Sequence, residues 1–267
     1  MFYLVMQYYV DKNEERQEEI DAVLTYNIKN ENIDKVIILA QNNYCNIMNV
    51  YSKFKTDKTE IHEFERLKFS NVFEFCKKNI PNNAIVAIVN NDIILDPNIK
   101  WIESIPHKNI VQCLTRHEIY HQGKCKIDEV IYQSGWAQDT WVFQNPMRDL
   151  NFLDFKVGND PGCDNAIVQR FAEAGLWCIN EAHKYKTYHI DCAPSRKCIG
   201  QVMMVEPSNK KECGDDWCNP VKEGGYNLPI CGAWKESKLP FKLLDILPNL
   251  KYKYHSSYFE VFDNIKL

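Results

Sequence analysis

The stretch AIVAIVNNDIILD, from Ala84 to Asp96, constrains the fold of this chain more than any other. An apolar run stops at Asn90, Asn91 and Asp92, and apolar residues then resume at once. An unbroken apolar run of this length is typical of a strand buried on both faces. Open α/β sheets place their ligands outside the carboxyl ends of such strands. The stretch therefore predicts a buried strand with a polar site at its end.

Strand-like and helix-like patterns alternate over the first two thirds of the chain. The predicted helices run from a cap near Asp11 to Ile28, from Ser70 to before Pro81, and from after Gly162 to Ala174. The predicted strands lie between them: Phe2–Val10, Lys35–Gln41, Thr59–Phe64, Ala84–Val89, Asn109–Thr115, Thr140–Phe143, Leu176–Ile179 and Tyr185–Ile190. This alternation predicts an α/β fold with a mostly parallel, Rossmann-like central sheet flanked by helices.

The chain divides by composition into two parts. Residues 1–192 carry the alternating pattern and are predicted to form the binding and catalytic domain. Residues 193–267 are rich in Cys, Gly, Pro and Lys, and are predicted to form an irregular extension on the same domain, with a helix near Leu239–Leu247 and a strand or arm from Tyr252. The cysteine spacing there matches no paired zinc pattern.

Charge and hydropathy exclude several classes of protein. The net charge of −4 gives no basic footprint for nucleic acid. No apolar run approaches the roughly 20 residues that span a bilayer. The N-terminus, MFYLVMQYYV, lacks the basic and small-residue features of a signal peptide and predicts a strand. The expected location is the cytoplasm, with cysteines as thiols.

Asn90 and Asp92 form the first candidate site. Their i, i+2 spacing allows both oxygen-bearing side chains to face a divalent cation, and such cations are commonly held by few protein groups plus substrate phosphates. This predicts Mn²⁺ or Mg²⁺ bound together with a diphosphate, with Asn91 beside it. The alternative is a plain turn, for which Asn and Asp are equally suited.

Asp164 is the candidate catalytic base. It follows Gly162 and Cys163 at the start of a predicted amphipathic helix, where the helix dipole favours a carboxylate. A rigidly held carboxylate can accept the proton of a sugar hydroxyl. A helix-capping role explains Asp164 without any chemistry and is the favoured alternative from the residue alone.

Other polar and aromatic residues are candidates for contacts to the same ligand. His189, in KTYHID, could complete a metal site or contact a phosphate, or be a structural histidine. Gln138, Asp139 and Trp141 suit a sugar, although core packing is an equal reading for the tryptophan. The candidates for the phosphates and for the nucleotide base are Arg66 and Arg196, and Tyr8, Tyr9 and Val10.

The order of these motifs resembles that of GT-A glycosyltransferases, closest to the compact domains of large DNA viruses. The resemblance rests on VNNDIILD (Val89–Asp96), LTRHE (Leu114–Glu118), QDTWVF (Gln138–Phe143), GCDNAIVQRFAEAG (Gly162–Gly175) and KTYHID (Lys186–Asp191). It implies metal and diphosphate binding at Asn90 and Asp92, an acceptor-activating base at Asp164, and a metal or phosphate contact at His189. If viral, the protein is expected in host cytoplasm or the virion.

One departure from the family pattern concerns the first acid of its D-x-D motif. Asn90 stands at that position, which removes one negative charge. Metal binding is therefore expected to be modest, or complete only with the donor bound.

These observations predict a metal-dependent glycosyltransferase. It would transfer a sugar, with inversion, from a nucleoside-diphosphate sugar to a hydroxyl group of a glycan, a protein or a lipid. A UDP-linked donor is preferred. The sequence leaves open whether the protein forms a homodimer. Two alternatives remain: a nucleotidyltransferase or phosphohydrolase on a similar sheet, and a non-catalytic sugar-binding protein with a degenerate site. The absence of a glycine-rich phosphate loop in the sequence weighs against the first.

Overall fold

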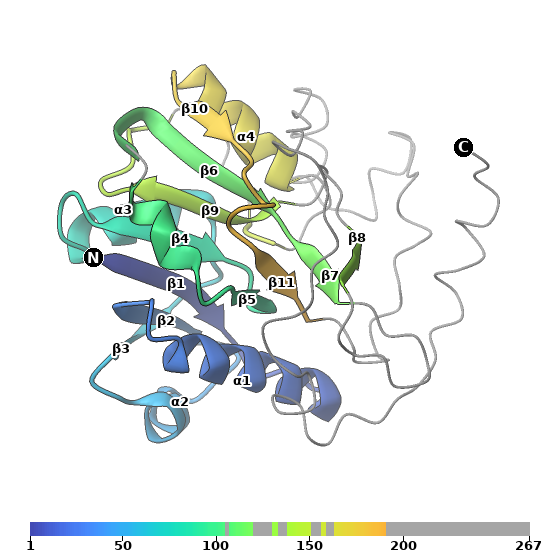
Figure 1. The fold of residues 1–267 in the computed structure, drawn as a ribbon. Coiled ribbons are helices and arrows are strands. Elements are labelled where there is room, and N and C mark those ends of the chain that lie inside the picture. The colour runs from blue at the N-terminus through green and yellow to red at the C-terminus, as the bar shows by residue number, and fades with distance from the viewer. Residues whose placement is uncertain (105–106, 120–129, 133–137, 151–155, 159–162, 191–267) are drawn as a thin grey trace, which may run out of the picture.

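The computed structural model describes residues 1–104, 107–119, 130–132, 138–150, 156–158 and 163–190. Helices and strands alternate over residues 2–89, as predicted, and the described residues from there to residue 144 form successive strands without an α-helix (Figure 1). The α-helices are α1 (Glu14–Lys29), α2 (Ile47–Phe54), α3 (Phe69–Asn79) and α4 (Cys163–Glu173). The strands are β1 (Phe2–Tyr8), β2 (Lys35–Gln41), β3 (Thr59–Phe64), β4 (Ile85–Val89), β5 (Ile93–Leu95), β6 (Ile110–Thr115), β7 (His117–Ile119), β8 (Val130–Tyr132), β9 (Gln138–Gln144), β10 (Trp177–Ile179) and β11 (Thr187–His189).

The central sheet has seven strands in the order β10-β6-β9-β4-β1-β2-β3. Neighbouring strands are parallel except at β9, which runs antiparallel to both β4 and β6. From β1 the chain adds β2 and β3 on one side and later β4 on the other. The order therefore reverses at β1 and β4, which is where open α/β sheets form a crevice at the carboxyl ends of their strands.

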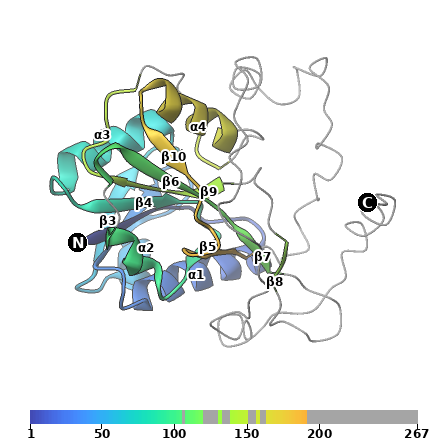
Figure 2. The ribbon, with the colours of Figure 1, turned by 45° about the horizontal axis from the view of Figure 1, so that its top comes forward.

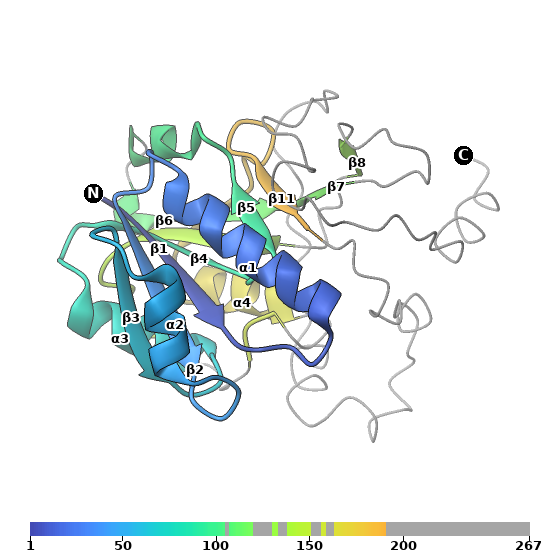
Figure 3. The ribbon, with the colours of Figure 1, turned by 90° about the horizontal axis from the view of Figure 1, so that it is seen from below.

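Helices cover both faces of this sheet, because side chains of each buried strand alternate between two cores. Leu4 and Met6 of β1 pack with residues of α1 and α2 in one core, and Val5 packs with residues of α3 and α4 in the other. Figure 3 shows α1 and α2 in front of the sheet and α4 behind it. The predicted α/β fold with a mostly parallel sheet is confirmed.

A smaller sheet of four strands, β5-β11-β7-β8, lies beside α1 (Figure 2). Buried Asn27 of α1 joins the two: its Nδ2 donates to the carbonyl of Ile93 at 2.9 Å, and its Oδ1 accepts from the amide of Leu95 at 3.0 Å. These bonds satisfy the backbone of β5. They fix the chain that immediately follows the Asn90–Asp92 segment.

The structure corrects the sequence-based elements at helix starts. Helix α1 is capped by Asn13, whose side chain accepts from the amide of Arg16, and not by Asp11. Helix α3 begins at Phe69, so Ser70 lies within its first turn. Helix α2 was not predicted, because its eight residues follow a strand closely and Asn46 is its one clear start signal.

No helix among the described residues is both long and apolar enough to cross a membrane. The predicted extension, residues 193–267, with its helix and arm, lies outside the described residues.

Candidate functional site

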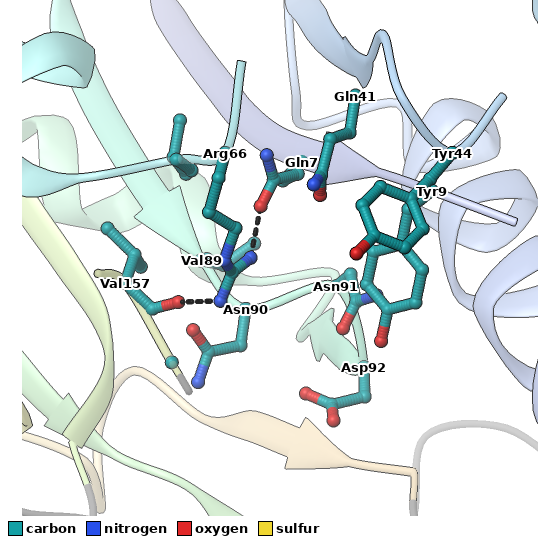
Figure 4. A pocket seen from close by; sticks show the side chains of 12 residues that line it. Gln7, Tyr9, Gln41, Tyr44, Arg66, Val89, Asn90, Asn91, Asp92 and Val157 are labelled. Carbon is teal, nitrogen blue, oxygen red and sulfur yellow. Dashed lines mark hydrogen bonds between the residues drawn. The ribbon is translucent and has the colours of Figure 1, made fainter. Parts of the chain in front are cut away.

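A polar pocket of about 310 Å³ opens at the carboxyl ends of the first four strands, at the predicted edge of the sheet. Its volume suits a small ligand. Figure 4 shows Tyr9 and Tyr44 on one side and Arg66 and Val157 on the other. The lining residues are Gln7, Tyr9, Gln41, Tyr44, Arg66, Leu67, Val89, Asn90, Asn91, Asp92, Val157 and Gly158.

Arg66 is the positively charged residue in this lining. It follows β3, and its guanidinium donates to Oε1 of Gln7 and to the carbonyl of Val157, the latter at 2.9 Å (Figure 4). These bonds hold its charge at the pocket wall. A guanidinium held in this way suits phosphate oxygens, the role predicted for Arg66.

Asp92 is 4% exposed and lies in a buried charged cluster. Its Oδ2 accepts from Nη2 of Arg16 at 2.6 Å and is 3.3 Å from Nε2 of His189. Arg16 also pairs with buried Glu19 at 2.9 Å and donates to the carbonyl of Ile190 at 3.1 Å. The structure thus brings the predicted residues Asp92 and His189 together, and adds Arg16, which the sequence analysis missed.

Arg16 was missed because its neighbours, EERQEE, are typical of a solvated helix face. Its burial depends on Asp92, which lies 76 residues away along the chain. The acidic partners favour its charged form, so the pKa of its guanidinium stays above the ordinary value despite desolvation.

Asn90 is joined to Asp139, at the start of the antiparallel strand β9. Its Nδ2 donates to Oδ1 of Asp139 at 2.5 Å, and its backbone amide donates to the carbonyl of Asp139 at 3.2 Å. The other carboxylate oxygen of Asp139 accepts from Nη1 of Arg116 at 2.6 Å. Both oxygens of Asp139, which was predicted to contact the sugar, therefore accept hydrogen bonds within the protein.

Gly158 touches the other side of Asn90. A Cβ at this position would lie 2.1 Å from Oδ1 of Asn90, and the backbone φ is +66°. Both the contact and the left-handed backbone require glycine. The chain around Gly158 thus packs directly against the end of β4.

Asp164 lies in the first turn of α4, and its Oδ2 accepts from the amide of Gln138 at 3.1 Å. Desolvation and the nearby charge of Asp139 raise its pKa to about 7, although hydrogen bonds from its own amide and that of Asn165, and the charge of Arg116, act in the opposite direction. A carboxyl group that titrates near neutral pH suits general-base chemistry. Asp139, whose charge acts on Asp164, is hydrogen-bonded to Asn90 of the pocket wall.

The structure places some predicted ligand contacts in the core. Tyr8 donates to Oδ1 of Asp21 at 2.8 Å, and its ring packs edge-on against Phe54, so it is no part of the pocket lining. Trp141 is fully buried and packs edge-on against Phe69. Both belong to strands buried on two faces, where the sequence pattern does not distinguish a core side from a ligand side.

The remaining candidates are distributed around the pocket. Tyr9 lines it, whereas Val10 is 46% exposed and absent from the lining. Gln138 is buried at the start of β9, where its backbone amide donates a hydrogen bond to the carboxylate of Asp164. Arg196 lies outside the described residues. Gln7, Gln41 and Tyr44 line the pocket without having been predicted; their place at or just after strand ends was the available signal.

The described side chains suit a divalent cation in part. A group of three or more His, Cys, Asp or Glu side chains that could hold a metal is absent among them. The side-chain NH₂ group of Asn90 donates a hydrogen bond to Asp139. Asp92 and His189 nevertheless adjoin each other, and Arg16 supplies one positive charge for two carboxylates, Asp92 and Glu19. Asp92 and His189 are therefore the described side chains that could contribute to a cation site.

No family model and no curated protein sequence matches this chain. Similar solved structures include HddC from Yersinia pseudotuberculosis, with 11% identity over 71% of this chain and 94% of that chain and a TM-score of 0.43. A 4-diphosphocytidyl-2C-methyl-D-erythritol synthase from Anaerococcus prevotii has 12% identity over 67% and 86%, with a TM-score of 0.40. TarS of S. aureus, in complex with UDP-GlcNAc, has 11% identity over 54% and 45%, with a TM-score of 0.34. These values assign the chain to no family. Its function is therefore inferred from the geometry of the site.

Proposed function

We propose that this protein is a glycosyltransferase that moves a sugar from a nucleoside-diphosphate sugar, UDP-linked by preference, to a hydroxyl group. The observation that carries the proposal is Asp164, a carboxyl group with a pKa of about 7 that is raised in part by the charge of Asp139, which is hydrogen-bonded to Asn90 of the polar pocket. A base poised near neutral pH and a pocket at the reversal of strand order are the two parts that this reaction needs.

The reaction would be one in-line displacement. The acceptor oxygen bonds to the anomeric carbon while the bond from that carbon to the diphosphate oxygen breaks, and the nucleoside diphosphate leaves with the bonding electrons. Asp164 takes the acceptor proton. Arg66, at the pocket wall, offers its charge to the diphosphate. One displacement inverts the anomeric configuration.

A divalent cation, Mn²⁺ or Mg²⁺, belongs to the same proposal. Asp92 and His189 would hold it together with the diphosphate, and it would supply Lewis-acid stabilisation of the leaving group. Because Arg16 already neutralises part of the charge of Asp92, cation affinity is expected to depend on the phosphates of the nucleotide.

A nucleotidyltransferase is the competing function, because the same pocket could hold a nucleoside triphosphate. In that reaction a phosphate oxygen attacks, and a phosphate monoester is largely ionised at neutral pH, since its second pKa is about 6. Such an attack needs no general base. The raised pKa of Asp164 therefore favours transfer to a hydroxyl group.

A nucleotide panel tests the proposal with the full-length protein. Thermal unfolding is measured with UDP, UDP-sugars, UTP and CTP, each with and without Mn²⁺; UDP and a UDP-sugar should raise the melting temperature most, because ligands that bind the native state stabilise it. Product analysis follows: UDP released from a UDP-sugar, with water as a slow acceptor, supports glycosyl transfer.

Pyrophosphate released from a triphosphate in the presence of sugar phosphates would assign the competing function. Stabilisation by UDP-sugars without any UDP release, at all pH values and with glycan acceptors added, would instead indicate a binding protein. Lys78→Ala provides the control, since this exposed lysine lies near the end of α3, at the opposite edge of the sheet from the pocket.

A further inference from the structure

The hydrogen-bonded pair of Asn90 and Asp139 joins two antiparallel strand ends at the pocket wall. One oxygen of the Asp139 carboxylate accepts from the Asn90 amide at 2.5 Å, and the other accepts from Arg116 at 2.6 Å. Asp139 is 6% exposed. A buried carboxylate with a donor on each oxygen is held in one position.

This pairing fixes how the Asn90 amide is turned. Only its NH₂ group can donate to a carboxylate, so its oxygen faces away from Asp139. That oxygen lies against Gly158. It occupies space that a Cβ atom at position 158 would otherwise take. Asn90 and Gly158 both line the pocket. Asp139 thus sets the direction in which Asn90 presents an acceptor.

The same geometry explains why position 90 is not an acid. A carboxylate at this position would place its oxygen about as close to Asp139 as the amide nitrogen now is. Two carboxylates at that separation cannot both stay ionised. An amide at 90 and an acid at 139 form a complementary pair, whereas two acids would repel.

We propose that Asp139, on the neighbouring strand β9, acts as the positioning residue for Asn90 in donor binding. The inference deepens the proposed function, and its link to donor binding rests on that function. It predicts that acid and amide can exchange places, because the pair and not either residue alone is required.

The experiment is a reciprocal exchange. Asn90→Asp and Asp139→Asn are made singly and together, and thermal unfolding and UDP affinity by calorimetry are measured for each. Asn90→Asp places two acids together, and Asp139→Asn sets an amide NH₂ against Asn90 or Arg116. Each single variant should lower the melting temperature by about 4 °C or more and weaken UDP binding at least tenfold.

The double variant should recover most of both losses. In it the amide at 139 donates to the acid at 90 and accepts from Arg116, so all three partners are satisfied. Asp149→Asn is the matched control, because this carboxylate is exposed and pairs with Lys77 on the surface; it should change neither quantity measurably.

A further readout tests whether the charge of Asp139 acts on Asp164. The charge of Asp139 raises the pKa of Asp164, whereas Arg116 lowers it. In Asp139→Asn the carboxyl resonance of Asp164, followed by NMR in the protein without nucleotide, should titrate at lower pH. An unchanged titration would contradict the proposed connection.

The outcomes distinguish this inference from the proposed function. If the wild-type protein does not bind UDP, the proposed function fails, while the melting temperatures still report whether the pair is reciprocal. If UDP binds but Asn90→Asp binds UDP and Mn²⁺ more tightly with no loss of stability, Asn90 is only a missing acid and the inference is overturned. Additive losses in the double variant overturn it as well.

Discussion

At the scale of single residues, the most consequential feature is a carboxyl group kept from ionising easily. The pKa of Asp164 is raised to about 7 by desolvation and by Asp139. The ionised form, which a base requires, is then the costly form in the native protein. As pH rises, Asp164 is therefore expected to become a better base while the free energy of unfolding of the protein falls.

The first prediction concerns the pH profile of the wild-type protein and of Asp164→Asn. In the wild type, kcat/KM for UDP release should rise with pH through about 7, as Asp164 loses its proton. Asp164→Asn should lose transfer by about 100-fold or more, the typical contribution of general-base catalysis, while UDP affinity stays close to that of the wild type.

The stability effect of the same substitution follows from the sign of the shift. A folded-state pKa above the ordinary 3.8 stabilises the native state at low pH, and this stability is lost as pH rises toward 7. Asp164→Asn should therefore unfold at a higher temperature than the wild type at pH 8, with the difference vanishing below pH 4. Equal loss of UDP binding and of transfer would show that Asp164 is structural.

At the scale of elements, strands were more predictable than the contacts at their ends. Strands β2 and β3 have the predicted bounds, because β2 is buried along nearly its whole length and β3, at the edge of the sheet, begins with alternating buried and half-buried residues. Contacts such as Asn90 with Asp139 depend on which strands become neighbours, which a pattern along the chain does not contain. Trp141 illustrates the limit, since β9 is buried on both faces.

The second prediction compares two glycines with similar backbones and different surroundings. Gly158 and Gly175 have φ values of +66° and +75°. A Cβ at Gly158 would lie 2.1 Å from Asn90, whereas at Gly175 the nearest atom, from Arg148, is 3.7 Å away. Alanine at either position should cost roughly 1 to 2 kcal/mol of stability from backbone strain.

The two variants should differ in the pocket. Gly158→Ala should displace Asn90 and weaken UDP binding by about tenfold or more, whereas Gly175→Ala should leave UDP binding unchanged. Urea unfolding and calorimetry of both variants measure the two effects separately. Equal UDP affinities would mean that Asn90 does not contribute to the pocket.

At the scale of the whole molecule, Arg16 ties together parts of the chain that are distant in sequence. It bonds Asp92, 76 residues away, and the carbonyl of Ile190, 174 residues away. The first helix, the end of β4 and the chain after β11 are thereby joined beside the pocket. Sequence reasoning placed Asp92 and His189 at one predicted metal site, whereas the burial of Arg16 beside Asp92 is a property of the complete fold.

The third prediction is that Arg16→Met strongly destabilises the protein. The substitution keeps most of the volume but leaves two buried carboxylates, Asp92 and Glu19, without this guanidinium. Losing one partner of a buried ion pair typically costs about 3 to 5 kcal/mol, a large part of the stability of an average domain. Urea unfolding should show this loss.

Lys78→Met serves as the comparison, because Lys78 pairs with Glu74 at the exposed surface of α3. Surface pairs contribute little, so this variant should unfold like the wild type. Equal free energies of unfolding for the two variants would contradict the view that the buried ion pairs of Arg16 stabilise the fold.

The reversed direction of β9 has a consequence for how such a site can diversify. Its antiparallel neighbour β4 delivers residues to the crevice as the chain leaves the sheet, whereas β9 delivers Gln138 and Asp139 as the chain enters it. Two stretches that are remote in sequence therefore share one rim. Insertions ahead of one strand or behind the other could reshape the pocket while every ladder of the sheet keeps its register.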